Sequence, residues 1–142
     1  MNDGITLPCD ARQWLPHRPP MTMVTRLLSY SCGEWSLVEA EIAPDNRFLR
    51  DGVLDNEAVP EIVAQACAAV NGFERPDDEL KGMLIGMRGI AFHEPIRGGD
   101  TLLIHVHETD ELDDYYILNF KVVRRGDGKL CADGEMSICR LS

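Results

Sequence analysis

The segment from Asp51 to Gly72 constrains the fold most, because it contains the only long apolar helix that this sequence predicts. Asp55 and Asn56 are suitable N-cap residues, and Pro60 fits the first turn of a helix. Gly72 is of the type that ends helices, so we expect the helix to stop there. The residues between these signals are apolar on nearly every side, which predicts a helix that is buried all round.

Two polar side chains, Glu61 and Gln65, interrupt this apolar helix after its start. Their spacing of four residues places them on one helical face. A buried carboxylate costs free energy unless a partner satisfies it or a reaction uses it. Glu61 is therefore either a solvated first-turn acid or a functional group. Gln65 either hydrogen-bonds this carboxylate and aims it, or is exposed.

Length and charge limit the classes of protein to consider. A chain of 142 residues predicts one domain over residues 1–142, with residues 1–13 loosely ordered. The formal net charge of −10 argues against a nucleic-acid partner, which requires a basic surface. No apolar run of about 18 residues is present, so we expect no membrane span.

The five cysteines are Cys9, Cys32, Cys67, Cys131 and Cys139. Their number is odd, and no two form a Cys-x-x-Cys pair. The sequence also has no signal peptide, so we expect reduced thiols in a cytoplasmic protein. Cys67 and Cys139 are interpreted as small apolar residues of the core.

Strand patterns surround the predicted helix, with loops expected at 45–54 and 74–81 and an acidic turn at 110–114. The expected strands are 36–42, 83–92, 101–108, 115–124 and 129–141. The segment 21–30 is either a further strand or a short helical turn followed by a strand. Strands, one buried helix and then a run of antiparallel strands predict an α+β domain whose sheet wraps its helix.

The histidines are the remaining candidates for chemistry. His17 lies among Pro16, Pro19 and Pro20, which form a stiff connection. A lone histidine is more often a surface residue, but this rigid setting favours a role for His17. His105 and His107 share one face of a strand without a third ligand at a defined spacing, so we predict no metal site and no cofactor.

Several motifs in this chain resemble those of the β-hydroxyacyl-[acyl carrier protein] dehydratases. The segment 15–21, Leu-Pro-His-Arg-Pro-Pro-Met, is similar to their Leu-Pro-His-Arg-x-Pro opening. The segment 61–65, Glu-Ile-Val-Ala-Gln, is similar to the Glu-x-x-Ala-Gln that begins their central helix. Segments 90–96 and 99–102 follow the same family order, and the likeness spans about residues 14–141.

The resemblance implies a hotdog fold, in which an antiparallel sheet wraps one long helix. It also implies a homodimer, or a heterodimer with a related dehydratase, in which two protomers join their sheets. The substrate would lie in a tunnel at the dimer interface, with the histidine and the helix carboxylate supplied by opposite chains.

One motif departs from the housekeeping dehydratases, whose catalytic histidine comes from a His-Phe-Pro-Gly loop before the helix. This chain has Asp-Asn-Arg-Phe-Leu-Arg-Asp-Gly at 45–52 instead. The Asn-Arg-Phe-Leu at 46–49 and the Leu-Ile-Gly-Met-Arg at 84–88 resemble the divergent branch from aryl-polyene and related fatty-acid-like clusters. That branch resembles this chain in these motifs and uses the histidine of its Leu-Pro-His motif. The resemblance therefore implies that His17 and Glu61 are the catalytic pair.

The implied reaction is the dehydration of a 3-hydroxyacyl thioester, carried by an acyl carrier protein, to the trans-2-enoyl thioester. The imidazole of His17 would take the C2 proton, and Glu61 would protonate the departing C3 hydroxyl. Backbone N–H groups near Asn56 and Glu57, at the helix start, would bind the thioester oxygen, with Gln65 beside them.

Two other functions remain open at this point. In a hotdog thioesterase Glu61 would activate water instead, and the missing loop histidine keeps open a non-catalytic subunit that completes the tunnel of a related dehydratase. The length and head group of the acyl chain also remain open. So does the choice between carrier protein and coenzyme A, because a chain at −10 repels acidic carrier proteins.

Overall fold

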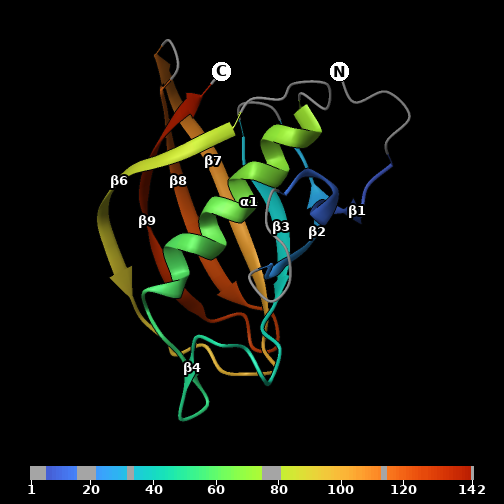
Figure 1. Cartoon of the computed structure of the whole chain (residues 1–142), viewed down its shortest axis with the longest axis vertical. Helices are drawn as coiled ribbons and strands as arrows, with labels where there is room; N and C mark the ends of the chain where they lie inside the picture. The colour runs from blue at the N-terminus through green and yellow to red at the C-terminus, as the bar shows by residue number, and fades with distance from the viewer. Residues whose placement is uncertain (1–5, 16–21, 32–33, 75–80, 113–114, 142) are drawn as a thin grey trace.

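The computed structural model shows an antiparallel sheet that curves around one long helix (Figure 1). It describes residues 6–15, 22–31, 34–74, 81–112 and 115–141. The elements are β1 (Cys9–Asp10), η1 (Ala11–Trp14), β2 (Val24–Ser29), β3 (Ser36–Glu41), β4 (Leu49–Arg50), β5 (Val53–Leu54), α1 (Ala58–Glu74), β6 (Lys81–Phe92), β7 (Thr101–Leu112), β8 (Tyr115–Arg124) and β9 (Leu130–Leu141). This arrangement confirms the α+β, hotdog prediction.

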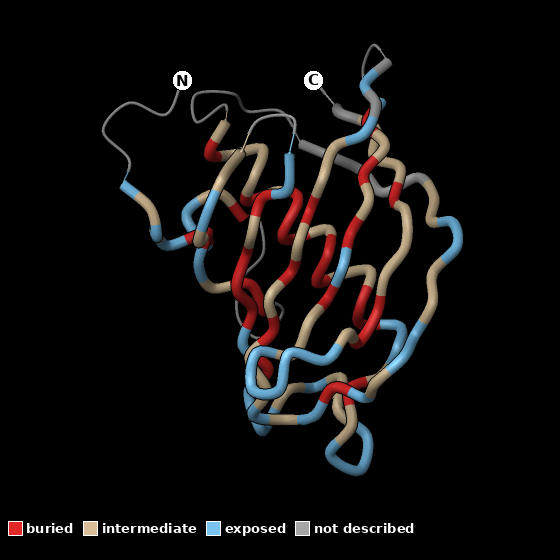
Figure 2. Tube along the Cα trace, turned by 180° about the vertical axis from the view of Figure 1, so that it is seen from behind, coloured by how far each residue is buried: buried red, intermediate tan, exposed pale blue. Residues whose placement is uncertain are grey.

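The main sheet has seven strands in the order β1-β2-β3-β7-β8-β9-β6. All neighbouring strands are antiparallel, so alternate residues face the helix. In β7 these inward residues are Leu102, Ile104 and Val106, all buried. Figure 2 shows from behind how buried positions recur along the central strands. The sheet therefore has an inner face that packs on α1 and an outer face on the opposite side.

Helix α1 is buried on the side that faces the sheet and partly exposed on the other. Four of its half-buried residues, Glu61, Ala64, Ala68 and Asn71, recur every three or four positions and form one stripe. The prediction that the helix is buried all round was therefore wrong for this chain. The sheet wraps only part of the helix circumference, and the stripe faces away from it.

The helix also continues past Gly72 and ends at Glu74, so the predicted stop at Gly72 was wrong. The reason for the glycine is steric. A Cβ at position 72 would overlap the side chain of Trp14, which lies directly against the helix backbone. Gly72 therefore permits a close approach, the other common use of glycine inside an element.

The segment 45–54, expected to be a loop, contains the short hairpin β4–β5. Asp51 and Gly52 both have positive φ, at 53° and 79°, which is the backbone of a two-residue hairpin turn. Arg50 pairs with Val53 across this turn. The Asp-Gly signal was present in the sequence, although the flanking runs are too short to show a strand period.

The prediction of loose order for residues 1–13 was wrong from Cys9 onward. Cys9 and Asp10 pair with β2, and Ala11 in η1 is completely buried. The Asp10 carboxylate accepts the N–H of Arg12 at 2.9 Å and so caps η1. Further along, β7 continues to Leu112, so residues 110–112 belong to a strand and not to the predicted acidic turn.

Candidate functional site

Glu61 lies in the first turn of α1, on the half-buried stripe of the helix. One carboxylate oxygen, Oε1, accepts a hydrogen bond from Nε2 of Gln65 at 3.1 Å. A helix places residues four apart on the same face, so this contact follows directly from the spacing in the sequence. Gln65 therefore hydrogen-bonds the Glu61 carboxylate, which was one of the two alternatives predicted for Gln65.

Gln65 connects this carboxylate to the sheet. Its side chain is completely buried, and its Oε1 accepts the backbone N–H groups of Met23 at 2.9 Å and Val24 at 3.2 Å. Both donors lie at the start of β2, so one buried amide joins the helix to that strand. The exposed alternative for Gln65 was therefore wrong, and this burial contradicts its expected contact with substrate.

The approach to α1 is fixed by the segment 46–57. Asn46 Oδ1 accepts the N–H of Phe48 at 2.8 Å, and the carbonyl of Phe48 accepts the N–H of Asp55 at 2.9 Å. Asp55 Oδ1 then accepts the N–H of Glu57 at 3.1 Å. The Glu57 N–H was expected to be free for a thioester oxygen, and this bond contradicts that expectation.

His17, the other predicted member of the catalytic pair, lies in the segment 16–21, outside the described residues. The residues on either side of that segment are well packed. Leu15 is buried on one side and Met23 on the other, where its N–H is bonded to Gln65.

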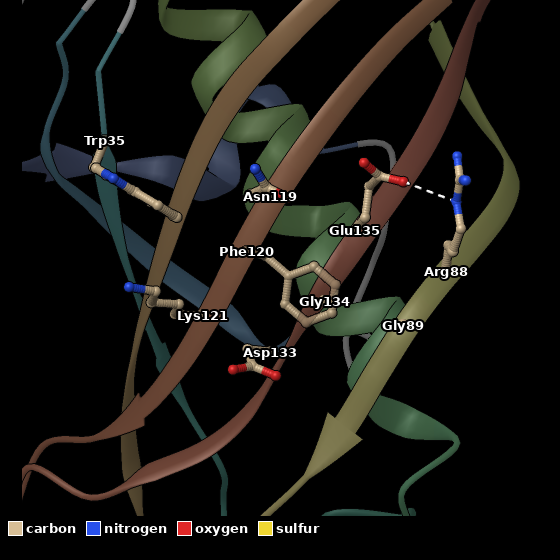
Figure 3. Close-up of a pocket in the computed structure, with 9 residues that line it drawn as sticks. All are labelled: Trp35, Arg88, Gly89, Asn119, Phe120, Lys121, Asp133, Gly134 and Glu135. Carbon is tan, nitrogen blue, oxygen red and sulfur yellow. Dashed lines mark hydrogen bonds and ion pairs between the residues drawn. The ribbon is translucent and has the colours of Figure 1, made fainter.

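A groove among the described residues lies elsewhere, on the outer face of the sheet (Figure 3). It encloses about 580 Å³ and is open to solvent. Lys121 lies over the ring of Trp35 at 5.1 Å, and Arg88 pairs with Glu135 at 3.2 Å. Glu61 and Gln65 do not line it, and α1 passes behind the sheet in this view. This groove is therefore separate from the Glu61 site.

His105 and His107 contact Trp35 on that outer face, with ring centroids 6.4 Å and 5.2 Å from the indole. Partial burial lowers the pKa of His105, and the charge of Lys121 lowers it further. Within the described residues no three His, Cys, Asp or Glu side chains are grouped as metal ligands would be. The aromatic contact accounts for the position of both histidines.

Four cysteines fall within the described residues, and all four are free thiols. Burial raises the pKa of Cys67 to about 12, so this thiol stays protonated, as an apolar core residue would. Cys139 is only half-buried, which corrects its interpretation as a core residue. No helix in the described part of the chain is long and apolar enough to cross a bilayer.

Comparison with known proteins adds a family match. Residues 9–141 match the family called ApeP-like, described as ApeP dehydratase. The 3-hydroxyacyl-[acyl-carrier-protein] dehydratase FabZ of Aromatoleum aromaticum is 29% identical over 134 residues, covering 88% of this chain and 90% of that protein. FabZ of Oleidesulfovibrio alaskensis is 28% identical over 147 residues, covering 96% and 94%.

Solved structures give the same architecture. The dehydratase heterocomplex ApeI:P of Xenorhabdus doucetiae contains a chain with a TM-score of 0.82 and 20% identity, covering 94% of this chain and 92% of that one. The protein smu.793 of Streptococcus mutans, bound to acetyl CoA, has a TM-score of 0.67 and 13% identity, covering 90% and 96%. At these identities the likeness supports the fold alone.

Proposed function

This chain belongs to the ApeP-like dehydratase family, and we propose from this that it dehydrates 3-hydroxyacyl thioesters to trans-2-enoyl thioesters in a fatty-acid-like or polyene pathway. The observation that carries the proposal is the hydrogen bond from Gln65 to Glu61 at the start of α1. This bond holds the Glu61 carboxylate on the half-buried stripe of a helix that is otherwise apolar. A group in that position can reach a bound thioester without being fully solvated.

In the proposed reaction the imidazole of His17 removes a proton from C2 of the substrate. The electron pair left on C2 delocalises onto the thioester oxygen as an enolate. Glu61, in its protonated form, gives its proton to the C3 hydroxyl, which leaves as water as the C2–C3 double bond forms. One proton is taken and one given, so no cofactor is needed.

The thioester oxygen requires hydrogen-bond donors as enolate charge develops. Asp55 already accepts the Glu57 N–H, and Pro60 has no N–H to offer. Backbone N–H groups near Asn56 and Glu57 were expected to bind the thioester oxygen. Of these two positions, we therefore retain Asn56. Asn56 is exposed and lies two residues before α1 begins at Ala58.

We propose an acyl carrier protein as the source of the acyl chain, because the FabZ relatives carry that carrier in their name. Four of the arginines that could attract an acidic carrier protein are each paired with a carboxylate, and these are Arg12, Arg26, Arg88 and Arg124. Assays with the same acyl chain on carrier protein and on coenzyme A would show which carrier this enzyme prefers.

We also propose that the chain works as a dimer, either with itself or with a related dehydratase. The half-exposed stripe with Glu61 would face a tunnel shared by two protomers. Strand β6 lies at the edge of the sheet, where a second sheet can pair with it. The similar ApeI:P chain belongs to a heterocomplex of dehydratases, which supports a partner of this kind. A cytoplasmic location, first inferred from the cysteine pattern, remains part of the proposal.

The deciding experiment follows the product formed from a 3-hydroxyacyl thioester, with the chain alone and with the chain co-expressed with a related dehydratase. A dehydratase yields an enoyl thioester with increased ultraviolet absorbance and no free thiol. Release of free thiol would instead identify a thioesterase. No turnover in the chain alone, with turnover in the mixture that persists when Glu61 is replaced by Gln, would identify a non-catalytic subunit.

A further inference from the structure

Three short segments form a small ribbon at the end of the molecule where α1 begins. The hairpin β4–β5 supplies two of them, and the segment 96–98 lies along the other side of β5. The Leu54 N–H donates to the carbonyl of Ile96 at 2.7 Å, and the Gly98 N–H donates to that of Gly52 at 3.2 Å. Figure 1 shows the hairpin projecting from this end of the molecule. We call β4, β5 and segment 96–98 the terminal ribbon.

The terminal ribbon brings two arginines onto one face. Arg50 lies directly opposite Val53 in the hairpin, and Val53 lies directly opposite Arg97. Residues that are directly opposite on neighbouring antiparallel strands project from the same face. Adjacent strands lie about 4.8 Å apart, so the Cα atoms of Arg50 and Arg97 are about 10 Å apart. The half-buried Val53 lies between them.

Both guanidinium groups are accessible to a partner. The Arg50 side chain is 83% exposed, and it contacts the Asp55 carboxylate through Nε alone, at 3.2 Å. Arg97 is also exposed, and within the described part of the chain its side chain has no ion pair. Asp55 and Asp100, the acids bonded to these two residues, each also accept a backbone N–H. The ribbon therefore presents positive charge on a chain whose net charge is −10.

Two further arginines near this end differ from this pair, because carboxylates bind them closely. Arg124 lies 2.7 Å from Asp127, and Arg125 lies 2.8 Å from the buried carboxylate of Glu39. Their charges are therefore largely neutralised within the protein. An acidic protein that approaches this end meets its strongest attraction at Arg50 and Arg97.

We propose that Arg50 and Arg97 form the docking surface for the acidic carrier protein that delivers the acyl thioester. This inference rests on the proposed dehydratase function and identifies where its partner binds. The hairpin leads through Asp55 into α1, whose first turn contains Glu61, so a carrier docked on the ribbon lies at the same end of the helix as this carboxylate. A local patch of opposite charge raises the rate of encounter even when the net charges repel.

The first test is the double variant Arg50→Glu with Arg97→Glu, assayed with one 3-hydroxyacyl chain on acyl carrier protein, on coenzyme A and on pantetheine. With the carrier protein, kcat/KM should fall by about 10-fold or more through a higher KM, because repulsion replaces attraction. With pantetheine, kcat/KM should stay within about twofold of wild type, since that substrate carries no acidic protein. The assays use the assembly in which the wild-type chain is active.

Two results with these substrates would overturn the proposal. Equal losses with carrier protein and pantetheine would show that the substitutions damage the site itself. A loss confined to coenzyme A would assign the arginines to the phosphates of that ligand. The double variant Arg50→Lys with Arg97→Lys keeps the charge and should retain most of the wild-type rate with the carrier protein.

Arg88→Glu is the matched control for the single variant Arg50→Glu. The Arg88 side chain is 82% exposed and pairs through Nε with one carboxylate, that of Glu135, also at 3.2 Å. It makes the same change of charge on the outer face of the sheet, so the rate with carrier protein should stay within about twofold of wild type. A loss as large as that of Arg50→Glu would show that net charge controls binding and would contradict docking on the ribbon.

Ionic strength gives an independent readout. The Debye length shortens from about 30 Å at about 0.01 M salt to about 8 Å at about 0.15 M. The wild-type kcat/KM with carrier protein should therefore fall over this range, and the double Glu variant should lose this fall. A wild-type rate that is the same at both salt concentrations would reject electrostatic docking.

Binding of the carrier protein can be measured without turnover. Calorimetric titration with holo-acyl carrier protein, which bears a free thiol and no acyl chain, should give a Kd about 10-fold higher for the double Glu variant than for wild type. Equal Kd values overturn the docking surface even if the protein is an active dehydratase. Weaker binding by the variant, in a protein without dehydratase activity, would reject the proposed function and support the docking surface.

Discussion

The indole of Trp14 lies against the backbone of α1 at Gly72, in the space that a Cβ would occupy. The same ring meets Phe73 edge-on, with centroids 6.0 Å apart and planes at 82°. Glycine costs a helix interior about 1 kcal/mol relative to alanine. The close contact with Trp14 offsets that cost, because it joins η1 to the C-terminal end of the helix.

We therefore predict that Gly72→Ala destabilises the protein by about 1–3 kcal/mol, although alanine is the better helix former. The added methyl group overlaps the Trp14 ring, and the ring must move. Urea unfolding followed by circular dichroism measures the change in the free energy of unfolding.

Gly126→Ala is the control, because no atom lies within 4 Å of a Cβ at that position. A double variant, Trp14→Ala with Gly72→Ala, should lose less stability than the sum of the two single variants, since the overlap is then absent. Additive losses in this cycle would show that Trp14 and Gly72 do not interact.

The sequence predicted the elements of this fold better than their contacts. The period-two pattern identified β8 at Tyr115–Arg124 with its observed bounds, because that strand is buried on one face only. The helix end at Gly72 was wrong, because a glycine that ends a helix and one that admits a tryptophan look alike in sequence. The spacing of Glu61 and Gln65 predicted their contact, whereas nothing local indicates that Gln65 also bonds to the start of β2, 41 residues away.

Glu61→Gln should lower the rate of dehydration by at least about 100-fold, because general acid catalysis contributes about 10²–10⁴-fold and an amide cannot supply that proton. Folding should be unaffected, since the amide oxygen still accepts a hydrogen bond from Gln65. Enoyl thioester formation, followed by absorbance, measures the effect. The matched control is Glu94→Gln, at a position 3.9 Å from Lys129 and on none of the elements around Glu61. A Glu61→Gln enzyme with near-normal turnover would remove Glu61 from the mechanism.

His17→Ala should cause a loss of similar size, because no base would then take the C2 proton. His93→Ala is its control, since His93 directly follows β6 and its Nε2 lies 3.4 Å from Oδ1 of Asp133. If both histidine variants retain full activity, the base is another group, and the motif shared with the aryl-polyene branch has a different role here.

Light scattering should give a mass of at least twice the 15.9 kDa of one chain at micromolar concentration. The reasons are that β6 lies at the edge of the sheet in the described part of the chain and that α1 has a half-exposed stripe, both of which a second protomer would cover. If the chain alone is monomeric, co-expression with a related dehydratase should yield a complex of the two. A monomer under both conditions contradicts the proposed tunnel between protomers.

The Glu39 carboxylate gives a prediction about stability and pH. It is only 2% exposed, although it lies on the outer face of β3, because Arg26 at 2.9 Å and Arg125 at 2.8 Å cover it. The hydrogen bond from Arg26 holds the pKa of Glu39 below its usual value, with a further contribution from Thr25. Hydrogen bonds to a charged group contribute about 1.5–3 kcal/mol, so Glu39→Gln should destabilise the protein by about that amount at pH 7.

Because the pKa of Glu39 is lowered by folding, its contribution to stability is complete above its usual value near 4.5 and is lost as the pH falls through the lower folded value. The difference in free energy of unfolding between wild type and Glu39→Gln should therefore shrink on acidification below that value. Glu135→Gln, which removes an exposed pair with Arg88, should change stability by less than about 1 kcal/mol at pH 7. Urea titrations at several pH values measure both variants, and a Glu39→Gln difference that does not change with pH would show that its ionisation is not coupled to folding.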